Sequence, residues 1–303
     1  MGDGQSKKRG RGWRLVAAGT ALLGVGGYLF LQYESTERGP ARCTVAGQDG
    51  AQAFELEPQM ARNAASIQAV AATRDLPERA VTIALATAMQ ESSLRNIDHG
   101  DRDSVGLFQQ RPSQGWGTVE EIMDPVYSAG RFYEGLVEVP GYTRLPLTVA
   151  AQNVQRSGFP QAYAKHEPDA SALAAALTGR RPAALSCRMG TAEPVPGIGS
   201  AIREKLVREF GEEVDASGGS AGTGRGAASS ALTIRVPAAD GAGVEEIERR
   251  GWELAHWSVA NASEMGIGRV EFGDRYWDAS HSADGWQENE KESGTEVRLT
   301  LVQ

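Results

Sequence analysis

The residue in this sequence best suited to acid–base chemistry is Glu91. It directly follows VTIALATAMQ, residues 81–90, a run that is apolar on nearly every side and therefore predicts a buried helix. A carboxyl group at the edge of such a helix loses hydration, which raises its pKa and lets it hold a proton near neutral pH. A general acid needs this property. The alternative interpretation is a glutamate that ends the helix and faces water.

Two further segments follow Glu91 in a suggestive order. Ser92 comes next, GLFQQ follows a polar loop at residues 106–110, and VAAQNVQRSGFPQAY occupies residues 149–163. This pattern resembles the soluble lytic transglycosylase and goose-type lysozyme superfamily. Its members carry Glu-Ser at the end of a buried helix, then a Gly-Leu-Met-Gln segment and an Ala-Tyr-Asn-x-Gly segment. The resemblance covers about residues 58–165 of this chain.

The resemblance implies that the protein cleaves the β-1,4 bond between N-acetylmuramic acid and N-acetylglucosamine in peptidoglycan, with Glu91 as the catalytic residue. Peptidoglycan glycan strands are then the expected partner, no cofactor is expected, and the implied fold is an all-α lysozyme-like domain. The third segment departs from the family pattern, because Gln155 stands where the family usually has tyrosine. The expected substrate-binding residues are Ser92, Gly106, Gln109, Gln155 and Tyr163.

Whether the product is an anhydro sugar or a hydrolysed one depends on a second carboxylate. Without one, Glu91 acts in turn as acid and as base toward the 6-hydroxyl of the sugar, as in lytic transglycosylases. With one about 6.5 to 9.5 Å away, water is the nucleophile, as in an inverting muramidase. The candidates are Asp98, Asp101 and Asp103, which are equally explained as solvated turn residues. The alternative to an enzyme is a catalytically weak or inactive peptidoglycan-binding scaffold.

Residues 249–286 resemble a C-terminal domain of exported wall proteins, related to zinc D-Ala-D-Ala peptidases of the hedgehog-like fold. The likeness lies in Leu254-Ala255, Val259-Ala260-Asn261-Ala262, Gly266-Ile267 and Arg275-x-Trp277. The positions of that family's zinc ligands are occupied here by Gly226, Thr233, Glu296 and Arg298. The sequence therefore predicts a non-catalytic module without a metal site.

Five helical stretches are expected before this module: Pro58–Arg74, Pro77–Ser92, Val126–Val139, and runs that open at Pro146 and Pro168. Residues 215–230, DASGGSAGTGRGAASS, are rich in Gly, Ser and Ala, and this composition predicts a flexible linker. Beyond it, strands from Leu232, Gly268 and Glu296 and a helix from Val244 to Met265 predict a small α/β fold. The expected domains are a lysozyme-like helical domain at residues 51–188, a linker at 189–230 and an α/β module at 231–303.

The N-terminal residues predict a membrane anchor. Residues 1–14 hold five Lys and Arg against one Asp, and residues 15–31 carry no charge and would span about 26 Å as a helix. The basic-then-apolar order predicts a cytoplasmic segment at 1–14, a transmembrane helix at 15–33 and a juxtamembrane segment at 34–50. The expected location is therefore the cell membrane, single-pass, with the C-terminal domains extracellular. A cleaved signal peptide and a buried soluble helix are the alternatives.

Cysteine usage and charge complete the expectations. Cys43 and Cys187 lie outside the two ends of the helical region, and in an exported chain they are expected to form a disulfide rather than remain free thiols. The chain carries a net charge of −8, and the residues after the basic N-terminus are more acidic still. Nucleic acid is therefore not an expected partner, because phosphate binding needs clustered cations. The sequence identifies no protein partner.

Overall fold

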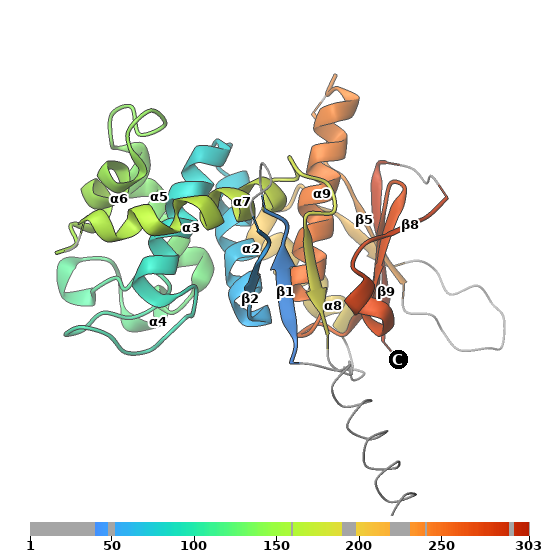
Figure 1. The fold of residues 1–303 in the computed structure, drawn as a ribbon, viewed down its shortest axis with the longest axis horizontal. Helices are drawn as coiled ribbons and strands as arrows, with labels where there is room; N and C mark the ends of the chain where they lie inside the picture. Colours follow the sequence, from blue (N-terminus) through green and yellow to red (C-terminus); the bar gives the residue numbers. More distant parts are fainter. Residues whose placement is uncertain are drawn as a thin grey trace, which may run out of the picture. The chain divides into compact units, whose positions relative to one another are not determined.

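Two antiparallel sheets and a group of helices pack together in the part of the chain that the structure describes (Figure 1). The computed structural model describes residues 40–47, 52–158, 160–189, 198–218, 231–239, 241–290 and 294–302. The chain from Ala41 onward forms one compact unit. The fold class is therefore mixed α/β, and the expected all-α domain followed by a separately linked α/β domain is wrong.

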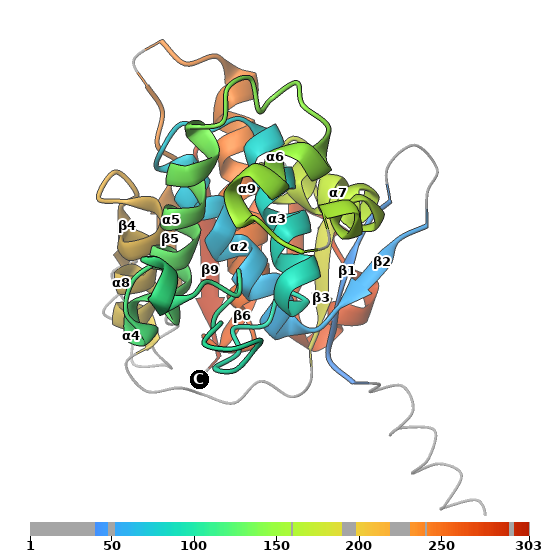
Figure 2. The ribbon, with the colours of Figure 1, turned by 90° about the vertical axis from the view of Figure 1, so that its left-hand side faces the viewer.

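Helix α3 lies at the centre of the helical part (Figure 2). All of its residues from Ala80 to Ala88 are buried, so the apolar run predicts its environment correctly. The five predicted helical stretches are confirmed within two residues at each end. The helices are α2 (Pro58–Ala72), α3 (Glu78–Ser92), α5 (Pro125–Val137), α6 (Leu147–Gln155) and α7 (Glu167–Leu177), joined in part by α4 (Val119–Ile122), η1 (Pro112–Gln114) and η2 (Pro160–His166).

A small sheet closes one side of the helical part. Its strands lie in the order β2 (Phe54–Leu56), β1 (Arg42–Val45) and β3 (Leu185–Arg188). Cys43 pairs with Cys187 across β1 and β3, and the two form the predicted disulfide. The all-α expectation misses this sheet because each strand has only three or four residues and finds its partner far away in the sequence.

A second sheet has the strand order β4-β5-β9-β6-β7-β8. Burial alternates along β5 and β9, so one face of the sheet is covered and the other faces water. Helix α9 (Val244–Asn261) packs on the covered face. The strands are β4 (Ala216–Gly218), β5 (Ala231–Arg235), β6 (Ile267–Phe272), β7 (Arg275–Asp278), β8 (Gln287–Glu288) and β9 (Glu296–Leu301), and the turn η3 covers Ala279–Asp284.

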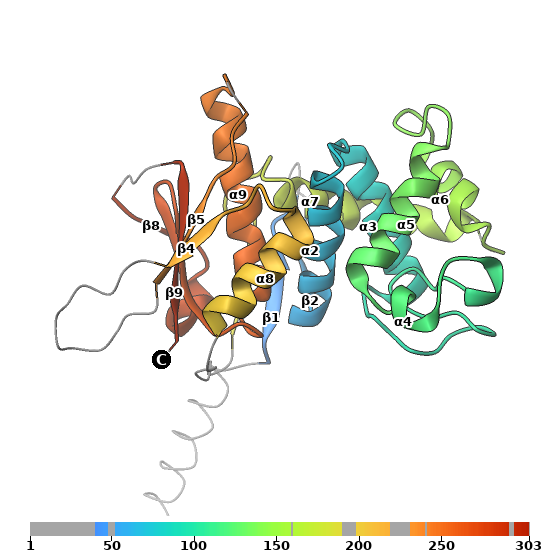
Figure 3. The same cartoon turned by 180° about the vertical axis from the view of Figure 1, so that it is seen from behind.

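Residues 198–218 belong to this packed structure and not to a flexible linker. Helix α8 (Ile198–Phe210) lies beside α2, and β4 joins the edge of the larger sheet (Figure 3). The buried Glu209 carboxylate accepts hydrogen bonds from Ser66 on α2 and Trp257 on α9, both over 2.6 Å. The apolar face of this amphipathic segment therefore packs against the fold. The expected linker includes this segment because a glycine-rich sequence follows it.

The predicted membrane anchor is not supported. Residues 1–39, which contain the expected transmembrane helix, lie outside the described residues. Of the helices that the structure describes, none is both long and apolar enough to cross a membrane. Even α9, with 18 residues, has six charged side chains among its first ten. This finding contradicts the expected single-pass location in the cell membrane.

Helix α9 joins the larger sheet to the helical part through buried polar contacts. His256 is fully buried, with Nδ1 2.7 Å from the carbonyl oxygen of Ala176 and Nε2 3.2 Å from the amide nitrogen of Ala184. Nδ1 therefore donates a proton and Nε2 accepts one, which is the neutral imidazole. Burial lowers the pKa of His256 to about 4.

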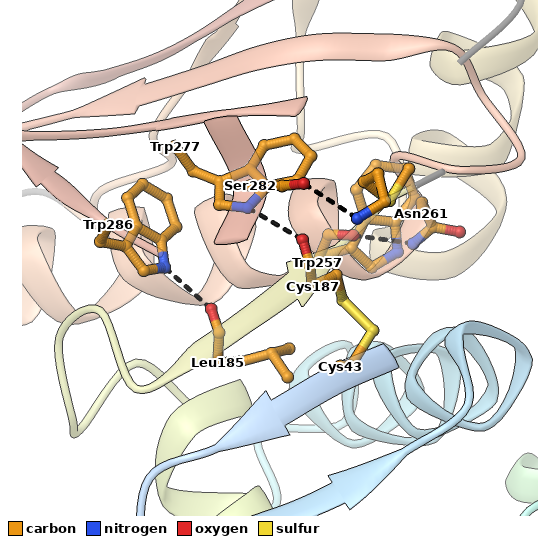
Figure 4. The surroundings of a disulfide bond; sticks show 9 residues. Cys43, Leu185, Cys187, Trp257, Asn261, Trp277, Ser282 and Trp286 are labelled. Carbon is orange, nitrogen blue, oxygen red and sulfur yellow. Dashed lines mark hydrogen bonds between the residues drawn. A yellow bond between two sulfur atoms is a disulfide. The ribbon is translucent and has the colours of Figure 1, made fainter. Parts of the chain in front are cut away.

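Strand β3 is also bonded by residues of the C-terminal part, from strand β7 and from the segment between β7 and β8 (Figure 4). The indole Nε1 of Trp277 donates to the carbonyl oxygen of Cys187 over 3.1 Å, and that of Trp286 donates to Leu185 over 2.8 Å. The amide of Met189 donates to Ser282 Oγ over 2.9 Å. The disulfide strand is thus shared between the small sheet and the C-terminal part.

We expect the stability of the fold to depend on His256 at mildly acidic pH. Because the unfolded histidine titrates near 6.5 and the folded one near 4, unfolded chains bind more protons between these values. The contribution of His256 is therefore complete above about pH 6.5 and falls by on the order of 3 kcal/mol as the pH approaches 4. Urea unfolding of the protein and of His256→Gln, from pH 7.5 to 4.5, measures it as the difference between the two curves.

The matched control is His281→Gln, because the His281 side chain is 75% exposed. This variant should follow the pH dependence of the unaltered protein. A constant difference between the unaltered protein and His256→Gln across this pH range would contradict the neutral, buried imidazole.

Removal of the disulfide should lower stability at neutral pH. The bond joins residues 144 positions apart, and in the loop-entropy model such a crosslink contributes about 4 to 5 kcal/mol by restricting the unfolded chain. The double variant Cys43→Ala, Cys187→Ala should lose about this much in urea unfolding. A loss below about 1 kcal/mol would show that the crosslink does not restrict the unfolded chain.

Candidate active site

Glu91 lies in the last turn of α3, at the end of its buried stretch. Ser93 ends the helix in a left-handed backbone conformation, with φ of 54°, and Leu94 follows with φ of 58°. Asn63 on α2 secures this reversal, because its Nδ2 donates to the Leu94 carbonyl oxygen over 2.7 Å. The position of Glu91 is therefore set by the packing of α2 against α3.

Two side chains from residues 149–163, the third segment of the motif pattern, contact the Glu91 carboxyl group. The Tyr163 hydroxyl donates to Glu91 Oε1 over 2.7 Å, and Gln155 forms a second side-chain hydrogen bond to the same group. Burial raises the pKa of Glu91, and these two hydrogen bonds lower it by less. The result is a carboxyl group that keeps its proton to a higher pH than a free glutamate does.

Tyr163 and Gln155 are themselves held by further contacts. Tyr163 is fully buried in η2, and its hydroxyl group is hydrogen-bonded by the Ser157 side chain. Gln155 ends α6, and its Nε2 donates to the Phe108 carbonyl oxygen over 2.8 Å. The Gln155 Oε1 atom is buried and has no hydrogen-bond partner among the described residues. An unsatisfied buried acceptor of this kind costs free energy.

Ser92 connects α3 to the segment at residues 106–110. Its Oγ donates to the Leu107 carbonyl oxygen over 2.8 Å and lies 3.1 Å from the Ala88 carbonyl oxygen. The Ser92 hydroxyl group is thus engaged by the backbone, and its structural role is to hold the 106–110 segment against the helix that carries Glu91.

Gly106 and Gln109 likewise make contacts within the protein. Gly106 has φ of 81°, and a Cβ atom there would lie 2.7 Å from the Ile122 carbonyl oxygen, so glycine is required by close backbone packing. Gln109 Nε2 lies 3.2 Å from the Gly106 carbonyl oxygen and 3.4 Å from that of His99. The structure gives Gln109 a role in holding the loop between these residues.

Asp98 and Asp101 lie in the loop between α3 and residues 106–110, and their side chains are exposed to water. Their side chains are 85% and 92% exposed, and they pair with the adjacent His99 and Arg102. In the described part of the chain neither forms a hydrogen bond with Glu91 or with the residues that hold it. They have the environment of solvated turn residues.

Asp103, the third candidate second carboxylate, is engaged elsewhere. It accepts hydrogen bonds from Arg111 Nε over 2.7 Å and from the amide of Ser113 over 2.9 Å. The hydrogen bond from Arg111 is the main reason that the pKa of Asp103 lies well below its ordinary value. Asp103 is therefore a charged residue that closes the loop, and the described contacts do not bring it to Glu91.

Gln155 lines a groove of about 1150 Å³. Trp116 contributes an aromatic ring to its lining, and Arg131 on α5 and Arg156, which directly follows α6, contribute cationic groups. Glu91 is not part of this lining. Gln155 lines the groove and also contacts the Glu91 carboxyl group.

Sequence reasoning misses Ser157 and the contact between Tyr163 and Glu91. The two partners of that contact are 72 residues apart, and no local pattern pairs them. Ser157 stands in the third segment, one residue after Arg156, so the segment itself is the only sequence signal for it. Cys43 and Cys187 belong to the small sheet and make no contact with Glu91.

The described residues of the C-terminal part add no side-chain contact to the Glu91 carboxyl group. Thr233 and Arg298 face each other across β5 and β9, and Gly226 lies outside the described residues. Within the described ranges, no group of three or more His, Cys, Asp and Glu side chains is placed to hold a metal ion. The buried His256 has both ring nitrogens engaged by the backbone.

Comparison with known proteins adds no assignment, because no protein-family model matches the chain and no curated protein matches it. The candidate site therefore stands on its own geometry and on the motif resemblance.

The hydrogen bond from Tyr163 should lower the pKa of Glu91. Hydrogen bonds to a carboxylate favour its charged form, so Tyr163→Phe should raise the pKa of Glu91 further. Carbon NMR titration of the glutamate carboxyl groups measures this shift, with Glu91 assigned from the Glu91→Gln spectrum. Tyr133→Phe is the control, because the Tyr133 hydroxyl is also buried but donates to the Ile67 carbonyl oxygen. An unchanged or lowered pKa in Tyr163→Phe would contradict the assigned contact.

Proposed function

We propose that the protein cleaves the glycan strands of peptidoglycan by lytic transglycosylation, with Glu91 as the acid and then the base. The single observation that supports this most strongly is the Glu91 carboxyl group. It lies at the end of a buried helix, its pKa is raised by burial, and Tyr163 and Gln155 hold it. General acid catalysis on a glycosidic oxygen needs a carboxyl group of this kind.

In the proposed first step, Glu91 gives its proton to the oxygen that links muramic acid C1 to the next sugar. Oε1 accepts from Tyr163, so the acidic proton is carried on Oε2, the other oxygen of the carboxyl group. The C1–O4 bond breaks as O4 gains this proton, and positive charge develops on the muramic ring. Glu91 is then a carboxylate, which the hydrogen bonds from Tyr163 and Gln155 stabilise.

In the proposed second step, the Glu91 carboxylate accepts the proton of the 6-hydroxyl of the same muramic residue. The O6 oxygen bonds to C1, which yields a 1,6-anhydro sugar and restores the protonated acid. One carboxyl group is sufficient for this sequence. The engagement of Asp98, Asp101 and Asp103 in contacts of their own supports it over attack by water.

The third segment has a specific part in this proposal. Gln155 takes the place of the tyrosine usual in the resembled family, while Tyr163 reaches the carboxyl group from η2. Trp116 in the adjoining groove offers an apolar ring for a sugar face.

We expect Glu91→Gln to reduce the release of soluble muropeptides from purified peptidoglycan by about 10²- to 10⁴-fold, because the amide cannot transfer the proton. Products of the full-length protein should carry 1,6-anhydromuramic acid and so be lighter by one water molecule than hydrolysed ones. Mass spectrometry of the released material tests both points. Glu120→Gln is the control, since Glu120 is an exposed residue of α4 remote in sequence from the site.

Two results would overturn the proposal. Muropeptides with a reducing-end muramic acid would mean that water is the nucleophile and that a second carboxylate acts. Release of no product, by a protein that still sediments with peptidoglycan, would mean that the lysozyme-like site serves a binding scaffold.

A further inference from the structure

Arg156 lies beside the residue that joins the groove to Glu91. It directly follows Gln155 and forms the C-cap of α6. Both residues line the groove, and Gln155 also contacts the Glu91 carboxyl group. Arg156 therefore lines the same groove as a residue that contacts Glu91.

The backbone at Arg156 suits another residue better. Its φ of 50° and ψ of 39° are left-handed, a conformation that glycine and asparagine adopt readily and that other side chains adopt at a cost. Strained positions of this kind collect at functional sites because the surrounding structure has to hold them. The packing around α6 therefore holds Arg156 in a conformation that costs free energy.

The charge of Arg156 is also uncompensated. Arg131, the other arginine of the groove, donates to Glu134 on the same helix over 2.6 Å. Arg156 forms no ion pair in the described part of the chain, including with Glu134 and Glu138, the two acids that line the groove. Among the described residues, Arg156 is therefore a cationic residue of the groove without an ion-pair partner.

We propose that Arg156 binds a carboxylate of the glycan substrate and makes the groove selective for strands that carry one. This inference rests on the proposed function, because Glu91 would act at the muramic residue and Arg156 lies one residue from a contact of Glu91. Muramic acid has a lactyl group, which bears either a free carboxylate or a peptide stem with carboxylates, whereas N-acetylglucosamine has neither. A guanidinium group binds a carboxylate through two parallel hydrogen bonds.

The test compares Arg156→Asn and Arg156→Lys with the unaltered full-length protein. Asparagine removes the charge and is at ease in the left-handed conformation, so this variant should fold with unchanged or higher thermal stability. Lysine keeps the charge but not the paired hydrogen bonds, so it should restore part of the lost affinity. Thermal unfolding of each variant separates a loss of binding from a loss of structure.

Three glycans separate the sources of the carboxylate: strands with peptide stems, strands stripped of stems that carry free lactyl carboxylates, and oligomers of N-acetylglucosamine. We expect Arg156→Asn to raise KM on carboxylate-bearing strands by about 10- to 100-fold with little change in kcat. Binding of the neutral oligomers should not change. A loss confined to stem-bearing strands assigns the stem carboxylates, and a loss confined to stripped strands assigns the lactyl group.

Binding measured in the Glu91→Gln background keeps this inference separate from the proposed function. If the unaltered protein cleaves nothing, but carboxylate-bearing strands bind and Arg156→Asn weakens that binding, the proposed catalysis fails and the carboxylate site stands. An equal loss on all three glycans, or no loss on any of them, would overturn the role of Arg156.

Discussion

Helix α9 is buried over its whole C-terminal part, with every residue from Gly251 to Asn261 inaccessible to solvent. It is covered by the larger sheet on one side and by α2 and α7 on the other. Polar groups within this stretch have hydrogen-bond partners: Glu253 pairs with Arg250 on the same helix and with Gln68 on α2. His256 bonds to the backbone of Ala176 on α7 and of Ala184, which directly precedes β3. Neither side could be removed without exposing this core to water.

The same packing positions the candidate site from a distance. Helix α9 supports α2 and α7, these two helices contact α3, and α3 carries Glu91 at its far end. The site lies on the helical side of the molecule, while the larger sheet lies on the opposite side of α9 (Figure 1). The C-terminal part therefore bears on the site through the packing of helices, and the described contacts of Glu91 come from the helical part alone.

Opposing influences on one carboxyl group give the site its chemical character. Burial favours the protonated form of Glu91, and hydrogen bonds from Tyr163 and Gln155 favour the charged form. The proposed function, in which Glu91 releases a proton and then accepts one, is compatible with this balance, because either influence alone would favour one state. The phenol of Tyr163 reaches this carboxyl group from the neighbouring turn η2.

Local pattern in the sequence was enough for the features that depend on nearby residues. The apolar run before Glu91 predicts the buried α3, prolines mark helix starts, and the placement of Cys43 and Cys187 predicts their disulfide. Tertiary structure alone decided the features that depend on distant partners. The small sheet pairs strands separated by the whole helical part, and α8 packs inside an expected linker. Tyr163 and Glu91 are 72 residues apart in the sequence. Their hydrogen bond depends on how separate elements pack, and such a contact produces no periodic pattern in the sequence.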